Sequence, residues 1–279
     1  MNITIIGLGL LGGSLAYALK GFRACRLTGF DIDGQTMQAA LANGAIERAA
    51  QNIPQSLQGA ELVILCVYPH SVIEIMQEYA GHLPPGCVIT DICGVKTPLY
   101  QEIAALLPEG VDYVGIHPMA GKEVEGFANA EPGLFRGAGF IIVPLDGTKA
   151  ESVELMHGLA AHIGATKIAV TNARTHDEII AYTSGLMHVS AAALCMDFHP
   201  QTSGAFTAGA FRDCTRIANI NPGMWSELLL MNKEPLLQQL DNFAQRLSQV
   251  RKALESGDKA ALYALLERAG ENKREMLKR

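Results

Sequence analysis

The chain has 279 residues, of which 49% are hydrophobic and 18% charged, and its formal net charge is −6. This length is nearly twice that of a typical domain of ~150 residues, and the composition is too apolar for a disordered chain. The net charge is negative and no long run of like charges occurs, so we expect neither nucleic acid nor a membrane as a partner. The six cysteines contain no CxxC spacing, which favours a reducing cytoplasm and gives no reason to expect a metal site.

Residues 2 to about 170 alternate short apolar runs with helical patterns, which is typical of βαβ units and a parallel sheet. We therefore expect an α/β domain over residues 1–171. The expected strands are 3–6, 26–30, 62–67, 88–91, 111–115, 140–143 and 166–170, and the expected helices are 11–20, 35–43, 71–79, 97–106 and 151–163.

The rest of the chain, residues 172–279, has only helical patterns and is expected to form a second, all-helical domain. Thr175 and Glu178 have the spacing of a capping box ahead of a helix that runs to residue 194. Another helix should begin near Pro222 and kink at Pro235, and Asp258 should cap a last helix that ends near residue 276.

An apolar seam with heptad-like steps follows Pro235, and such a seam needs a surface to pack against. Packing within the chain is one explanation and a homodimer is the other, and we favour the homodimer. The seam consists of Leu236, Leu240, Phe243, Leu247, Val250 and Leu254.

A glycine motif links the first expected strand to the first expected helix. Gly7, Gly9 and Gly12 form G-x-G-x-x-G, and Asp31 lies nineteen residues past the last glycine, at the end of the second strand. This context is typical of dinucleotide binding in a Rossmann-type, doubly wound sheet. A carboxylate at Asp31 would bind ribose hydroxyls and repel a 2′-phosphate, so NAD is preferred over NADP. The alternative is a glycine-rich turn that binds no nucleotide.

Further cofactor contacts are expected from the loop residues around the motif and from the ends of two later strands. Ligands of doubly wound sheets bind outside the carboxyl ends of the strands. For Lys96 the alternative is an ordinary solvated lysine at a helix start. The expected contacts are Leu8, Leu10, Leu11, Val67, Tyr68, Pro69, Asp91 and Lys96.

His117 is the strongest candidate for chemistry, because it directly follows the expected strand 111–115 and precedes Pro118. The proline favours an extended backbone, which would hold the imidazole at the carboxyl edge of the sheet. Imidazole suits the removal of a hydroxyl proton near neutral pH. The alternative is a histidine that only hydrogen-bonds to backbone.

The helical half holds a second group of candidate residues. Ser184 and His188 are four residues apart, as are Arg212 and Arg216, so each pair shares a helix face if its segment is helical. Paired arginines can bind carboxylates. Trp225, the only tryptophan, suits either a pocket wall or the core.

Two acids near these candidates have simpler explanations. Asp213 can form a salt bridge with Arg216 within one helix, and Asp177, beside His176, can complement a helix dipole in the first turn. Direct roles in chemistry remain open for both.

Taken in order, residues 7–14, 91–96, 115–121, 176–188 and 211–225 resemble the prephenate/arogenate dehydrogenase family of tyrosine biosynthesis. The His-Pro-Met-Ala-Gly run from His117 and the Phe-Arg-Asp-x-Thr-Arg run to Arg216 are more specific than the glycine motif. The resemblance implies a Rossmann-type NAD(P) domain, a helical domain that forms the homodimer, and oxidative decarboxylation of prephenate to 4-hydroxyphenylpyruvate.

The resemblance also implies roles for single residues. His117 matches the catalytic histidine that polarises the ring hydroxyl, Arg216 matches an arginine that binds a substrate carboxylate, and His188 matches a histidine on the substrate's side chain. His176 and Asp177 match a pair nearer the domain interface and are also expected to bind substrate. Trp225 matches a pocket aromatic, and Arg212 and Ser184 complete the expected substrate site.

The chain departs from the family pattern at Gly94, where the family commonly has a serine that assists the catalytic histidine. Thr90, Thr97 or a water could replace that hydroxyl. Because His188 is kept, we expect prephenate rather than arogenate as substrate. Two different functions would also use the glycine motif: a Rossmann-plus-helical dehydrogenase of the 3-hydroxyacid or pyrroline-carboxylate reductase kind, and an NAD-binding regulatory protein without catalysis.

Overall fold

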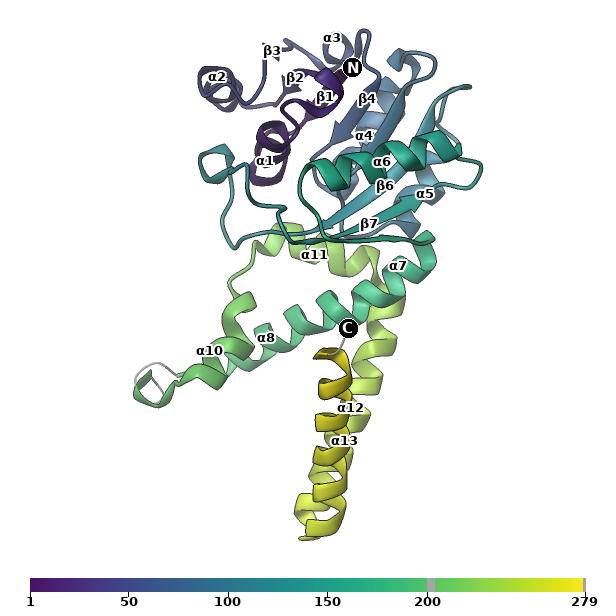
Figure 1. The fold of residues 1–279 in the computed structure, drawn as a ribbon. Coiled ribbons are helices and arrows are strands. Elements are labelled where there is room, and N and C mark those ends of the chain that lie inside the picture. The colour runs from purple at the N-terminus through teal and green to yellow at the C-terminus, as the bar shows by residue number, and fades with distance from the viewer. Residues whose placement is uncertain (200–203, 278–279) are drawn as a thin grey trace. The chain divides into compact units, whose positions relative to one another are not determined.

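The structure is a computed structural model that describes residues 1–199 and 204–277 (Figure 1). The remaining six positions, which belong to the predicted second domain, lie outside the described residues. The chain divides into two compact units, Met1–Asn232 and Lys233–Arg279. The predicted boundary between residues 171 and 172 lies inside the first of these units and stays a prediction.

The first unit is built on one eight-stranded sheet with the order β3-β2-β1-β4-β5-β6-β7-β8. The order of the first six strands is that of a Rossmann-type doubly wound sheet, as expected from the sequence. The strands are β1 (Asn2–Ile6), β2 (Arg26–Phe30), β3 (Arg48–Ala49), β4 (Leu62–Leu65), β5 (Val88–Asp91), β6 (Asp112–Met119), β7 (Gly139–Pro144) and β8 (Lys167–Val170).

Helices cover both faces of this sheet, and the strands alternate between the two cores. Ile5 and Ile64 pack on the side of α1 and α6, whereas Val63 and Leu65 pack on the side of α4 and α5. Apolar side chains on both faces explain why these strands are continuous apolar runs. The helices of this layer are α1 (Leu10–Ala18), α2 (Gly34–Ala42), α3 (Ile53–Leu57), α4 (Pro69–Tyr79), α5 (Thr97–Ile103) and α6 (Ala150–His162).

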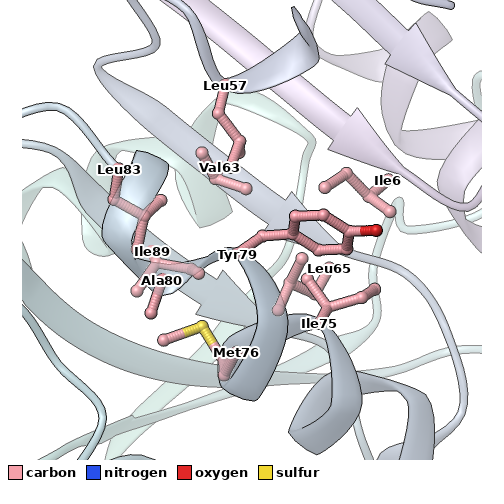
Figure 2. A pocket seen from close by; sticks show the side chains of 10 residues that line it. All are labelled: Ile6, Leu57, Val63, Leu65, Ile75, Met76, Tyr79, Ala80, Leu83 and Ile89. Atoms are coloured by element: carbon pink, nitrogen blue, oxygen red, sulfur yellow. The ribbon is translucent and has the colours of Figure 1, made fainter. Parts of the chain in front are cut away.

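A small pocket lies within the second core, where α4 faces β4 and β5 (Figure 2). Tyr79 lies across it, and the other nine lining residues are apolar (Figure 2). Because the lining offers no charged group, this pocket is a packing feature of the core and not a site for chemistry.

The expectation of a parallel sheet holds for every strand pair except one, because β6 and β7 are antiparallel. The chain between them contains only a short 3₁₀ turn at Phe127–Asn129. A parallel pair needs a long crossover, usually a helix, and none is present here. The pairing also lengthens β6 to Met119, so His117 lies inside the strand opposite Ile141 instead of after it.

The helical part of the first unit begins with a long helical run. It consists of α7 (Ala173–Ile180), a π-helical turn at Ala181–Gly185, and α8 (Leu186–Met196). The predicted capping box is wrong, because Asn172 is the cap and its side chain accepts a hydrogen bond from the Thr175 amide. Two shorter helices follow, α10 (Gly209–Thr215) and α11 (Pro222–Met231).

The second unit is a pair of helices, α12 (Lys233–Glu255) and α13 (Lys259–Leu277). Pro235 lies in the first turn of α12, where proline is tolerated, so the predicted kink is instead a break between two helices. The Asp258 side chain accepts a hydrogen bond from the Ala261 amide and caps α13, as predicted. In the seam of α12, Leu247 and Leu254 are 53% and 62% exposed.

Candidate active site

The glycine loop between β1 and α1 has the shape that its sequence predicts. Gly7 has a φ of +88°, which favours glycine, and a Cβ on Gly12 would lie 1.9 Å from the Gly7 carbonyl oxygen. A Cβ on Gly9 would meet nothing within 4 Å. Two glycines are therefore required by the turn itself, while the third leaves open space beside the backbone.

The N-terminus of α1 offers its amides without competition from the protein. No side chain caps this end, and the first turn carries no acidic residue. Unpaired amides at a helix N-terminus bind phosphate groups well. The loop therefore fits the pyrophosphate of a dinucleotide. The side chains of Leu8 and Leu10 are buried, at 0% and 8% exposed, and Leu11 is half-buried, so Leu8 and Leu10 offer only their backbone to a ligand.

Asp31 lies directly after β2 and faces the glycine loop. Its carboxylate accepts hydrogen bonds from the Leu8 amide at 2.7 Å and from the Asp33 amide at 2.9 Å. Each carboxylate oxygen keeps a free acceptor direction for a ribose hydroxyl. Ile32, which the sequence analysis did not single out, is 96% exposed beside it and offers an apolar face to a base.

The loops after β4 and β5 differ in exposure. Tyr68 is 46% exposed and Val67 is half-buried, whereas Pro69 is buried at the start of α4. Asp91 and Lys96 are fully buried and form an ion pair of 2.6 Å. The alternative of a solvated Lys96 is therefore wrong.

Both members of this buried ion pair make further hydrogen bonds, which offset the cost of burying the charges. Asp91 also accepts hydrogen bonds from the Cys93 amide and from the Tyr113 hydroxyl, at 2.8 and 2.7 Å. Lys96 Nζ also donates to the Ile116 carbonyl oxygen at 2.8 Å. The pair thus supports β6 immediately before His117.

His117 is joined to two side chains of α7. Its Nδ1 lies 2.9 Å from Nε2 of His176, and Nδ1 of His176 lies 2.7 Å from Oδ1 of Asp177. His176 and Asp177 are buried, at 1% and 2% exposed. The structure therefore brings together three residues from β6 and α7 that the sequence analysis treated as two separate groups.

Burial and hydrogen bonding together set the protonation states of this trio, His117, His176 and Asp177. Desolvation, together with the neighbouring His176 and Lys96, holds the pKa of His117 well below its usual value. Desolvation also lowers the pKa of His176, although the hydrogen bond to Asp177 opposes it. Burial would raise the pKa of Asp177, but hydrogen bonds from His176 and Thr97 outweigh it and lower that pKa. Two neutral imidazoles and one carboxylate result near neutral pH.

Two carboxylates of the helical part cap helices of the sheet layer, which the sequence analysis did not predict. Asp177 accepts hydrogen bonds from the amides of Lys96 and Thr97 at the start of α5, at 2.9 and 2.7 Å. Glu227 of α11 accepts one from the His70 amide in the first turn of α4, at 2.6 Å. Asp177 is therefore not the first-turn dipole partner of its own helix. No local pattern in the sequence reveals caps between distant segments.

His188 and Trp225 form one unit in the helical part. Their rings stack with centroids 3.6 Å apart, and His188 Nδ1 lies 2.9 Å from the Ser184 carbonyl oxygen. Desolvation lowers the pKa of His188. Ser184 lies in the π-helical turn, a deviation that is frequent at functional sites.

Arg212 lies in α10, whereas Arg216 begins the 3₁₀ turn Arg216–Ala218 that follows it directly. The exposed Arg216 side chain forms an ion pair with Glu123 of the loop after β6, and among the described residues it forms no ion pair with Asp213, which was the alternative to a direct role for that acid. Arg212 is exposed on α10. Glu123 is a second residue that the sequence analysis missed.

Gly94 lies beside the reactive end of His117. A Cβ at Gly94 would lie 3.7 Å from both Cε1 and Nε2 of the imidazole. Of the suggested substitutes for the family serine, Thr90 is fully buried in β5, and its hydroxyl donates to the Asp91 carbonyl oxygen at 3.5 Å. The Thr97 side chain hydrogen-bonds to Asp177, as does its amide.

Comparison with known proteins gives a consistent result over the whole chain. The family model described as the nucleotide-binding domain of prephenate dehydrogenase matches residues 15–169, and the one described as its dimerization domain matches residues 172–268. The prephenate dehydrogenase of Bacillus subtilis is 31% identical over 94% of this chain and 72% of its own length.

Solved structures agree in fold. Prephenate dehydrogenase from Aquifex aeolicus, in complex with hydroxyphenyl propionate and NAD⁺, is 25% identical with a TM-score of 0.89, over 99% of this chain and 98% of its own. Synechocystis arogenate dehydrogenase is 26% identical with a TM-score of 0.85, over 99% of this chain and 100% of its own. The chain therefore belongs to the prephenate dehydrogenase family.

Proposed function

We infer that the chain is an NAD-dependent oxidoreductase that oxidatively decarboxylates prephenate to 4-hydroxyphenylpyruvate in tyrosine biosynthesis. Family membership supports this function, and the observation that carries it is the position of His117, a neutral imidazole on the strand after the buried ion pair. Such a group can accept the proton of a ring hydroxyl.

NAD supplies the hydride acceptor when it is bound. We propose that the glycine loop holds its pyrophosphate, that Asp31 binds the adenosine ribose, and that the loops after β4 and β5 border the nicotinamide. Asp91 and Lys96 are buried, so we propose that they hold these loops in place and that their side chains do not contact NAD. The proposed contacts are Gly7, Leu8, Gly9, Leu10, Leu11, Gly12, Asp31, Val67, Tyr68 and Pro69, with the buried Leu8, Leu10 and Pro69 contributing through their backbone.

The reaction balances without another oxidant. His117 Nε2 accepts the proton of the 4-hydroxyl, the hydrogen on the same carbon leaves as hydride, and the ring carboxylate departs as carbon dioxide. The electron pair of the broken carbon–carbon bond completes the aromatic ring, and His117 returns its proton to the phenolate oxygen. Aromatisation supplies the driving force, so the protein must mainly position and polarise the substrate.

Substrate anchoring is assigned to the helical part. Arg216 is proposed to bind a substrate carboxylate in exchange for Glu123, with Arg212 adding positive charge nearby. The stacked His188 and Trp225 are proposed to contact the side chain of the substrate, beside Ser184. A chain of net charge −6 has no attractive long-range field for a dianion, so these local charges must bind it.

We propose a homodimer in the cytoplasm. The match to a dimerization domain supports the homodimer, and so do apolar side chains left exposed on the helical part, among them Tyr182 at 57% and Leu230 at 70%. Ala173–Met196 is the one helical run of the described residues long and apolar enough to cross a membrane. Its polar groups at His176 and Asp177 hydrogen-bond within the protein, which suits an interface better than lipid.

One assay tests the function. NADH formation is measured with prephenate, arogenate and a panel of 3-hydroxyacids, each with NAD and with NADP. We expect turnover of prephenate with NAD. Turnover of 3-hydroxyacids alone would move the chain to another dehydrogenase class, and NAD binding without any turnover would indicate a regulatory protein.

Arogenate is a second candidate substrate, which one observation favours. The Ser184 carbonyl oxygen can only accept a hydrogen bond, so it takes the proton of His188 Nδ1 and leaves Nε2 as an acceptor while the ring is neutral. An acceptor suits the ammonium group of arogenate, whereas the keto group of prephenate is bound better by a protonated His188. The prephenate/arogenate ratio of kcat/KM should therefore fall as pH rises, and a ratio independent of pH would remove His188 from substrate selection.

A further inference from the structure

Every residue of the trio at His117 has a defined hydrogen-bonding direction. Oδ1 of Asp177 also accepts from the Lys96 amide, and Oδ2 accepts from the Thr97 amide. An ionised carboxylate has no proton to give. Nδ1 of His176 must therefore donate to Asp177, which leaves Nε2 of a neutral His176 as an acceptor.

The tautomer of His117 follows from the same reasoning. Its Nδ1 faces the acceptor Nε2 of His176 at 2.9 Å and must therefore carry the proton. Nε2 of His117 is then unprotonated, and it lies on the side of Gly94, which has no side chain to cover it. The tautomer with a bare Nε2 is the one that can accept a hydroxyl proton.

We propose that His176 and Asp177 are positioning residues that fix the tautomer and the ring orientation of His117, and that they do not bind substrate. Only the kinetic test of this proposal rests on the proposed function. It also explains how His117 is oriented in a chain that has Gly94 where a serine is common in the family. Burial of both side chains supports it, since 1% and 2% exposure leaves no surface for substrate.

The Asp177 carboxylate both caps α5 and accepts a hydrogen bond from His176. Replacing it would therefore remove both contacts at once, and their effects on kcat could not be separated. Substitutions of His176 leave the cap in place. His176→Asn puts an amide near the former Nδ1, where it can reach Asp177 but not His117. His176→Gln puts the amide near the former Nε2, where its oxygen can accept from His117. The two variants differ by one methylene group.

The expected result is a kcat about 10²-fold lower in His176→Asn, at the lower end of what general-base catalysis contributes. The KM for prephenate and the Kd for NAD should stay within about twofold of the wild type, and His176→Gln should recover most of kcat. His162→Asn, at an exposed histidine of α6, is the control and should leave all three constants unchanged. An unchanged kcat in His176→Asn, a higher KM at unchanged kcat, or His176→Gln as slow as His176→Asn would each overturn the proposal.

A spectroscopic measurement tests the same proposal without activity. In ¹⁵N-histidine-labelled protein at neutral pH, the signals missing from His117→Gln identify His117. We expect its proton on Nδ1 in the wild type and a mixture of tautomers in His176→Asn. A proton on Nε2 in the wild type would overturn the proposal even if a variant failed to fold. Failure of wild-type prephenate turnover would instead refute the proposed function and leave this test intact.

Discussion

The glycine loop and the histidine trio belong to the same sheet but are built in opposite ways. The loop after β1 offers backbone amides and positions without side chains, and its parts lie within a few residues of one another. The trio joins β6 to α7, is held by a buried ion pair from β5, and depends on side chains far apart in sequence. We infer that the loop governs cofactor affinity and the trio governs the chemical step, so substitutions should separate the two.

The largest effect is expected at His117. His117→Gln removes the proposed base and should lower kcat about 10²–10⁴-fold, the range that general acid–base catalysis contributes. The Kd for NAD, measured by fluorescence titration, should change less than twofold. A comparable loss of NAD affinity would contradict the separation of the two regions.

Replacing Arg216 tests the proposal that this residue binds a substrate carboxylate. Arg216→Gln removes the proposed charged hydrogen bond to the substrate carboxylate, a type of bond worth about 1.5–3 kcal/mol, so KM for prephenate should rise about 10- to 150-fold while NAD affinity is kept. Steady-state kinetics at saturating NAD measure this. Lys167→Gln, at an exposed cation of β8, is the control, and an unchanged KM in Arg216→Gln would remove Arg216 from the site.

A smaller and opposite effect is expected in the loop. A Cβ at Gly9 meets no protein atom within 4 Å, so Gly9→Ala should fold normally but obstruct the pyrophosphate. The Kd for NAD should rise about tenfold, or 1.4 kcal/mol, with kcat at saturating NAD unchanged. Gly81→Ala, also in open space, is the control. A lower kcat without weaker binding would show that the loop acts on the chemical step.

The smallest effect concerns pH and stability. The pKa of His117 is lower in the folded protein than in the unfolded chain, so below pH ~6.5 the unfolded chain binds the additional proton. Stability at neutral pH is therefore lost on acidification, and one such histidine contributes at most about 1.4 kcal/mol for each pH unit. Denaturant unfolding at pH 7 and 5.5 should show a smaller loss in His117→Gln. An equal loss in both proteins would assign the pH dependence to other groups.

The same contrast explains what the sequence could predict. The motif at Gly7, Gly9, Gly12 and Asp31 is local, so spacing and context were enough, and most strands of the sheet were expected within a few residues. The antiparallel β7 was missed because apolar runs carry no sign of strand direction. The extension of β6 past Gly115 follows from that pairing and from nothing in its own residues.

Contacts between distant segments were not predictable. His176 and His117 were both candidates, but their hydrogen bond depends on how α7 packs beside β6. Lys96 fitted a surface position equally well, since only the fold reveals that Asp91 pairs with it in the core. The family resemblance suggested roles for His117, His176 and Asp177 one by one. The structure adds which of them are hydrogen-bonded to one another.

The most direct test of the proposed chemistry is the stoichiometry of one reaction. Wild-type protein is given prephenate and NAD, and NADH, carbon dioxide and 4-hydroxyphenylpyruvate are measured together. The account predicts one of each per prephenate consumed. NADH without carbon dioxide, or no NADH from a protein that binds NAD, would contradict it.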